Sequence, residues 1–315
     1  YTKGMHFTKS KYITTFQEED FKAGVEMFNK AIELDPEYAS AYFGLSWAYE
    51  HHYHVTRDRR DLEQAKEYCE TALRFDPYSA QSIAMRGYYY YEYDGDYDKA
   101  FQSFQRALEI NPNIGVVNFL TGACLLYHGL YHQALPYLLK TMELDPYYFW
   151  TPYKVATCYT VLGEFDKAAL YYEKYFELAP IVLIFPGRYI ALNVKMDRFD
   201  VVEELIARTE KSHPDYSLLP YSKALLLAAR GGEKEEVLAL HKNSEVYSLL
   251  NMKDEAIEHL NREIRGEVRI PYAYYYFLLN NPFYDNLRED PRFKKIVKRE
   301  KKLHDSELKK YSYLK

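Results

Sequence analysis

Three histidines within four residues, His51, His52 and His54, form the tract of this sequence best suited to binding a metal. Imidazole nitrogen is a common metal ligand, but a stable zinc site needs three or four protein ligands. No carboxylate or cysteine lies at a supporting spacing beside these histidines. We therefore predict that residues 51–61, HHYHVTRDRRD, form a solvated turn with a short insertion and not a metal site.

The cysteines point to packing and not to chemistry. Cys69, Cys124 and Cys158 are odd in number, far apart and embedded in helical patterns. A disulfide framework or a structural zinc site would need closely spaced pairs of thiols. We predict that all three are buried as small apolar residues.

Motifs that assemble a catalytic centre are missing from the sequence. There is no G-x-x-x-x-G-K-[ST], no G-x-S-x-G and no H-E-x-x-H, and no G-x-G-x-x-G follows a predicted strand. Most Asp and Glu residues lie on predicted outer helix faces, where they keep the surface soluble. We predict a protein that is not an enzyme and needs no cofactor or metal, with catalysis inside a helical groove as the alternative.

The net charge and the hydropathy of the sequence limit the classes of partner that we expect the chain to bind. The 315 residues carry a net charge of −5, which disfavours direct binding of nucleic acid by the bulk surface. A basic run near the end of the chain is predicted to be a solvated helix face, with an acidic or phosphate-bearing partner as the alternative; it comprises Lys294, Lys295, Lys298, Arg299, Lys301 and Lys302. No apolar run reaches the roughly 18 residues of a membrane span.

Prolines recur at a nearly constant spacing through most of the chain. Pro112, Pro146 and Pro180 are 34 residues apart at each step, and Pro36, Pro77 and Pro214 extend the series. Similar phrases precede five of these prolines: AIELDP, ALRFDP, ALEINP, TMELDP and YFELAP. Because proline biases the preceding residue away from the α conformation, each phrase predicts the end of a helix.

Each period predicts two amphipathic helices joined by a glycine-bearing turn. Gly129 and Gly163 occupy equivalent turn positions, and Ala134 and Ala168 recur where two helices must approach closely. One such pair cannot bury its own apolar face, so successive pairs must stack. Prolines in first helical turns predict that helices begin near residues 151, 185 and 219.

This period resembles that of the tetratricopeptide repeat (TPR). The resemblance covers residues 1–266, although the repeats after Pro180 depart from the pattern. It implies an all-α, right-handed superhelical solenoid of about seven to eight helix pairs. Residues 267–315 are predicted to form capping helices that cover the last apolar face.

Within that family, residues 1–50 and 281–297 resemble the C-terminal TPR region of membrane-anchored bacterial regulators. Such regulators join the array to a DNA-binding, adenylate cyclase or kinase module. Because the chain begins at Tyr1 within a helical pattern, we expect it to be part of a longer protein or a processed form. The segment would then be cytoplasmic or periplasmic according to the missing part, to which a membrane tether could belong.

The first helices of TPR pairs line a concave groove, and three positions of each helix should face it. These positions are mainly aromatic and apolar, unlike the Lys, Arg and Asn of TPRs that hold a peptide carboxylate, so we reject that mode. The predicted partner-binding residues are Phe43, Trp47, Tyr88, Phe119, Trp150, Tyr153 and Tyr221. Rigid aromatic rings suit contact with an extended peptide. The alternative is that these rings only fill the inner side of the superhelix.

Three functions follow from this pattern as hypotheses. The first is a non-catalytic scaffold that binds a protein or peptide segment in the aromatic groove. The second is a sensor that binds a small ligand and acts on an output module upstream of residue 1. The third is self-association into a homodimer through the degenerate C-terminal end.

Overall fold

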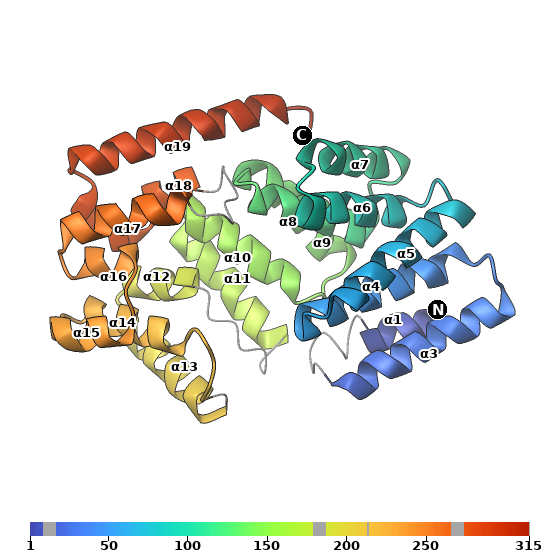
Figure 1. The fold of residues 1–315 in the computed structure, drawn as a ribbon, viewed down its shortest axis with the longest axis horizontal. Helices are drawn as coiled ribbons and strands as arrows, with labels where there is room; N and C mark the ends of the chain where they lie inside the picture. Colours follow the sequence, from blue (N-terminus) through green and yellow to red (C-terminus); the bar gives the residue numbers. More distant parts are fainter. Residues whose placement is uncertain (9–16, 179–186, 213, 266–273, 315) are drawn as a thin grey trace.

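The computed structural model describes residues 1–8, 17–178, 187–212, 214–265 and 274–314, and these residues form helices and turns with no β-strand (Figure 1). The helices follow one another as stacked pairs along a curved array. The all-α solenoid predicted from the proline spacing is confirmed.

Eight helix pairs can be assigned in the described residues. The first four are α1 (Thr2–Met5) with α3 (Glu18–Leu34), α4 (Ala39–Thr56) with α5 (Arg59–Phe75), α6 (Ala80–Tyr89) with α7 (Tyr97–Ile110), and α8 (Gly115–Tyr127) with α9 (Tyr131–Leu144). The next four are α10 (Trp150–Leu162) with α11 (Phe165–Leu178), α12 (Gly187–Lys195) with α13 (Phe199–Ser212), α14 (Leu219–Ala229) with α15 (Lys234–Leu240), and α16 (Ser244–Leu249) with α17 (Lys253–Arg265). A π-helical turn, η2 (Tyr90–Asp94), extends α6.

In the described part of the chain after Arg265, three further elements follow the pairs. They are α18 (Tyr274–Asn280), the 3₁₀ turn η3 (Pro282–Leu287) and the long α19 (Pro291–Lys310). The predicted boundary at residue 266 lies outside the described residues. None of the described helices is both long and apolar enough to cross a membrane.

The helix ends follow the local chemistry of the sequence. Asp35, Asp76 and Asp145 leave their helices in extended or near-extended conformations, each directly before a proline. Helix α14 begins at Leu219 as predicted, with Pro220 in its first turn. Helix α10 begins at Trp150, one residue before the predicted start. The third predicted start, at residue 185, lies outside the described residues.

The prediction of a solvated turn at residues 51–61 is wrong. Helix α4 continues to Thr56, and the chain reverses at Arg57, whose φ of 60° is left-handed, before α5 begins at Arg59. The additional residues of this repeat therefore lengthen its helices. The physical reason is that the histidines find carboxylate partners when they continue the helix: the buried Glu50 for His51 and His54, and Glu18 and Asp61 for His52.

Close contacts between helices depend on small side chains. Gly122 of α8 faces Leu138 and the carbonyl oxygen of Ala134 so closely that an added Cβ would lie 2.8 Å from Leu138 Cγ and 3.2 Å from that oxygen. Ala134 and Ala168 are completely buried. The three cysteines are buried and free, so the prediction that they act as small apolar residues is confirmed.

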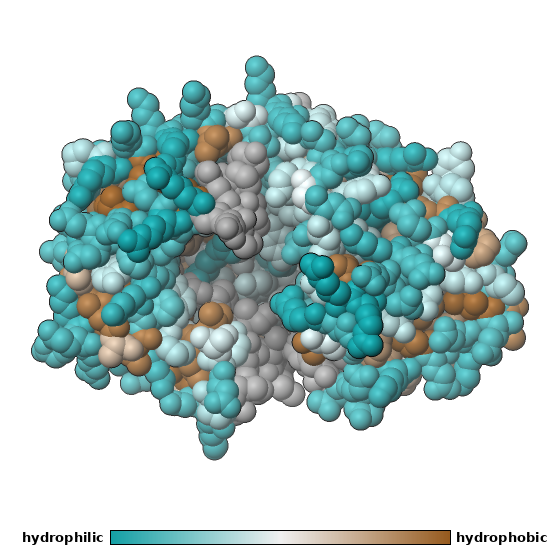
Figure 2. Space-filling view, viewed as in Figure 1, coloured by the Kyte–Doolittle hydropathy of each residue, from teal (hydrophilic) through white to brown (hydrophobic). Residues whose placement is uncertain are grey.

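Helix α19 connects the C-terminal end of the array to its middle. It leaves the neighbourhood of α17 and extends across the molecule until its C-terminal end lies beside α7 (Figure 1). There Glu307 lies 3.1 Å from His128 Nε2, and the Tyr311 hydroxyl donates a hydrogen bond to Asp98 at 2.7 Å. The face in Figure 2 is mostly hydrophilic, with small separate apolar patches and a hollow near its middle.

Candidate binding groove

A cavity of about 350 Å³ opens between the first helices of four consecutive pairs, α4, α6, α8 and α10. Its aromatic lining consists of Trp47, Tyr88, Phe119, Tyr127, Tyr148 and Trp150. Its polar lining consists of Glu50, His51, His54 and Lys154. The cavity thus combines large apolar surfaces with a few charged groups, as ligand sites commonly do.

Four of the seven predicted groove residues, Trp47, Tyr88, Phe119 and Trp150, line this one cavity. They come from four different helix pairs and are brought together by the stacking of the repeats. Phe43 lines a neighbouring cavity of about 240 Å³ that shares Trp47 with the first.

The other two predicted residues lie elsewhere. The Tyr153 ring lies 5.9 Å from that of Trp150 and 5.5 Å from that of Tyr175, which places it behind the cavity wall. Tyr221 lies on α14 and hydrogen-bonds to Glu245, far along the array in the cluster formed by α12 to α16. The structure therefore does not bring Tyr221 to the cavity.

The aromatic wall is packed ring against ring. Trp47 lies 6.2 Å from Tyr148 and 4.4 Å from the imidazole of His51, and Phe119 meets Tyr148 edge-on at 4.8 Å. Such offset and edge-on contacts fix the orientation of the rings. Trp47 is only 2% exposed, and its indole N–H has no hydrogen-bond acceptor in the described part of the chain.

Glu50 is a buried carboxylate held between two histidines at one side of the cavity. His51 Nδ1 lies 2.8 Å and His54 Nε2 2.6 Å from its two oxygens. Burial of Glu50 favours the neutral acid, but the two histidines outweigh this effect and hold the pKa of the carboxyl well below its usual range. Partial burial likewise opposes charge on His54, yet the adjacent Glu50 raises the pKa of His54 above 6.5.

Lys154 provides a buried cation at another part of the lining. It is 8% exposed, and its Nζ lies 4.3 Å from the ring centre of Tyr127, whose hydroxyl it also contacts. The rings of Tyr153 and Trp150 lie 5.5 and 6.0 Å away. Burial lowers the pKa of Lys154 from its ordinary value of 10.5. Aromatic faces attract a cation but do not neutralise it.

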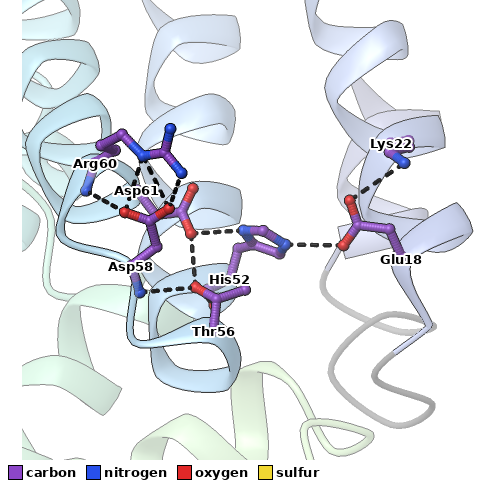
Figure 3. Close-up of polar contacts among 7 residues, drawn as sticks. All are labelled: Glu18, Lys22, His52, Thr56, Asp58, Arg60 and Asp61. Atoms are coloured by element: carbon purple, nitrogen blue, oxygen red, sulfur yellow. Dashed lines mark hydrogen bonds and ion pairs between the residues drawn. The ribbon is translucent and has the colours of Figure 1, made fainter.

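His52 has a structural role that separates it from its two neighbours. Its Nδ1 lies 2.8 Å from Asp61 of α5 and its Nε2 lies 2.9 Å from Glu18 of α3, so the ring bridges three helices (Figure 3). The same ring stacks on Phe21 at 3.9 Å. Within the tract, His52 therefore packs between helices, whereas His51 and His54 line the cavity. Across the described ranges, no group of three or more His, Cys, Asp or Glu residues is arranged to hold a metal ion.

Sequence reasoning missed Lys154, although a signal for it was present. Lys154 lies eight residues after the closing Pro146, and Arg188 lies eight residues after the closing Pro180. The same position in the two preceding repeats holds Met85 and Leu120, which are apolar and also line the cavity. A charged residue at a position that is otherwise apolar and buried is a candidate binding residue.

Models of the tetratricopeptide repeat family match residues 16–80 and 80–114. No curated protein matches the chain significantly. Solved structures of low identity do match. PilF of Pseudomonas aeruginosa is 19% identical, with 70% of this chain and 99% of PilF covered and a TM-score of 0.48.

Two other solved structures are similar to the chain. Human IFIT1, solved as a dimer with PPP-AAAA, is 15% identical over 78% of this chain and 68% of its own, with a TM-score of 0.49. YrrB, described as a TPR protein with an unusual peptide-binding site, is 22% identical over 63% of this chain and 98% of its own, with a TM-score of 0.42. On the strength of the family models, residues 16–114 of the chain are tetratricopeptide repeats.

Proposed function

We propose that this chain is a non-catalytic interaction module whose aromatic cavity binds an extended segment of a partner protein. The observation that supports it best is the convergence of six aromatic side chains from consecutive repeats on one cavity. TPR folds are commonly protein–protein interaction modules.

The cavity has physical properties that suit a peptide anchor. Its volume of about 350 Å³ accommodates one or two large side chains, and its rings are already held by mutual packing. Binding therefore costs little additional ordering of the protein, which is a main advantage of rigid aromatic surfaces. The interaction energy of such interfaces is concentrated in a few buried anchors.

A second candidate is a small-ligand sensor that uses the same cavity. The observation that favours it is the volume, which falls at the lower end of the range for small-molecule sites. The output module of such a sensor would lie upstream of residue 1. Peptides and small molecules can be distinguished by direct binding measurements.

The two tryptophans of the chain, Trp47 and Trp150, both line the cavity, so intrinsic fluorescence reports its occupancy directly. Peptides without tryptophan would be selected from a random display library on the intact chain and then titrated. We expect these peptides to change the tryptophan fluorescence. In the Tyr88→Ala variant, their affinity should fall by about tenfold or more.

Tyr159→Ala is the matched control, because Tyr159 lies on α10 but is stacked on Tyr171 outside the cavity lining. Equal loss of affinity in both variants would contradict the assignment of the cavity. If no selected peptide altered the tryptophan fluorescence, the proposed function would be wrong.

A further inference from the structure

Lys154 forms no ion pair with any of the described residues. No Asp or Glu oxygen of the described residues lies within 4.0 Å of its Nζ, although the chain forms many such pairs on its surface. Its ammonium donates a hydrogen bond to the hydroxyl of Tyr127. A buried charge without a paired charge is costly, so proteins rarely keep one without a use.

The charged groups near Lys154 act in opposite directions. Arg188 of α12 disfavours the charged form of Lys154 and Glu92 of η2 favours it, but no Glu92 oxygen lies within 4.0 Å of the ammonium. The one carboxylate of the cavity lining, Glu50, is already paired with His51 and His54. The charge of Lys154 therefore is not balanced from within the cavity.

A second donor in the same lining also lacks a partner. The buried indole N–H of Trp47 has no acceptor among the residues that the structure describes, and Trp47 lines both this cavity and the adjacent one. A bound segment supplies acceptors of two kinds, carboxylate oxygens and backbone carbonyls. An occupant with only apolar groups would leave the ammonium of Lys154 without a paired charge.

From these contacts we propose, as a consequence of the proposed function, that the partner segment places an apolar side chain in the aromatic cavity and pairs an adjacent Asp or Glu side chain with Lys154. The apolar group lies against Trp47, Phe119 and Tyr148. The carboxylate forms a charge-assisted hydrogen bond with the ammonium in a site shielded from water, where such bonds are strongest.

The geometry favours an internal acidic side chain over a free C-terminal carboxylate. A terminal carboxylate is usually bound by several donors together. Among the described residues the cavity lining contains no Asn or Arg, since Arg188 lies outside it. A single ammonium suits one side-chain carboxylate in a segment that continues in both directions. Acetylated and amidated peptides remove the terminal charges and isolate this contact.

The test compares each selected peptide with its Glu→Gln or Asp→Asn counterpart by tryptophan fluorescence. Both would be titrated into the wild-type chain, Lys154→Met, Lys154→Arg and the control Lys174→Met, whose side chain is exposed on α11. We expect the neutral peptide to bind the wild type about tenfold or more weakly, and Lys154→Met to lose that preference. Lys154→Arg should keep part of it, and Lys174→Met all of it.

The peptide substitution tests the proposal even if Lys154→Met folds poorly. Selected peptides that bind the cavity equally well with Glu or Gln would overturn the role of Lys154 and leave the proposed function standing. Binding only through a free C-terminal carboxylate would also overturn it. A response to 4-phenylbutyrate, with none to any peptide, would overturn both this inference and the proposed function in favour of a small ligand.

Discussion

At the scale of single residues, we expect Lys154 to destabilise the fold while it contributes to binding of the partner. A charged amine in an aromatic environment destabilises the fold, and an apolar side chain of similar length removes that penalty. We predict that Lys154→Met raises the free energy of unfolding by on the order of 1–3 kcal/mol at pH 7, measured by urea denaturation. Lys174→Met, at an exposed position, should change it by less than about 0.5 kcal/mol.

The pH dependence of stability provides a second test of the energetic cost of burying Lys154. Because the pKa of Lys154 is lowered in the folded chain, the unfolded chain binds more protons between the folded pKa and 10.5. The stability of the wild type therefore rises with pH in that window relative to Lys154→Met. A difference between the two proteins that stayed constant from pH 7 up to the ordinary lysine pKa of 10.5 would show that Lys154 is not penalised by burial.

His54 should make the fold respond to pH in the opposite sense. Glu50 raises the pKa of His54 in the folded chain, so its stabilising effect is complete below the unfolded pKa of 6.5 and is lost as the pH rises through the folded value. We predict that the stability of the wild type relative to His54→Gln falls as the pH is raised through this window. Thermal unfolding across the window measures it.

His6→Gln is the control for this experiment, since His6 is exposed in the N-terminal segment. Its difference from the wild type should show no such fall. A His54→Gln profile parallel to that of the wild type would mean that Glu50 is stabilised by His51 alone.

At the scale of elements, the close approach of α8 and α9 depends on the missing side chain of Gly122. We predict that Gly122→Ala destabilises the protein by about 1–3 kcal/mol, because the new methyl group would overlap Leu138 and approach a backbone carbonyl. Chemical denaturation measures the loss.

Gly115→Ala is a matched control in the first turn of the same helix. A Cβ there would meet its nearest neighbours at 3.5 and 3.7 Å, which is ordinary contact. The substitution should be nearly neutral or slightly stabilising, since alanine favours the helix. A similar loss from both changes would show that the α8–α9 spacing is adjustable.

At the scale of the whole molecule, α19 connects the C-terminal helices to α7 and α8. Tyr311 is 2% exposed and lies 4.4 Å from the ring of Phe101, while Tyr313 is 44% exposed. We predict that Tyr311→Ala costs about 3 kcal/mol and speeds amide exchange in α19 and also in α7 and α8. Hydrogen exchange with mass spectrometry locates the change.

The corresponding change at Tyr313 serves as the control and should leave exchange in α7 and α8 unaltered. Faster exchange confined to the last turn of α19 after Tyr311→Ala would mean that this helix does not stabilise the middle of the array. The aromatic cavity would then depend only on contacts between neighbouring repeats.

The sequence by itself determined the helical architecture and part of the groove. The proline period, the Asp-Pro and Asn-Pro helix exits and the small residues such as Ala134 are local signals, and each acts within one or two turns of helix. They were sufficient to predict the stacked pairs, the buried cysteines and four aromatic residues that line one cavity. These residues could be predicted because equivalent positions in successive repeats lie on the same side of the array.

The tertiary structure alone decided which charges meet which rings. Glu50 pairs with His54 only because α4 continues through residue 54. Lys154 reaches Tyr127 only because α8 and α10 stack beside each other. Glu307 meets His128 across 179 residues of sequence. The physical reason is that such contacts depend on the accumulated rotation between repeats, which no single repeat specifies, whereas helix boundaries depend on interactions between residues close in sequence.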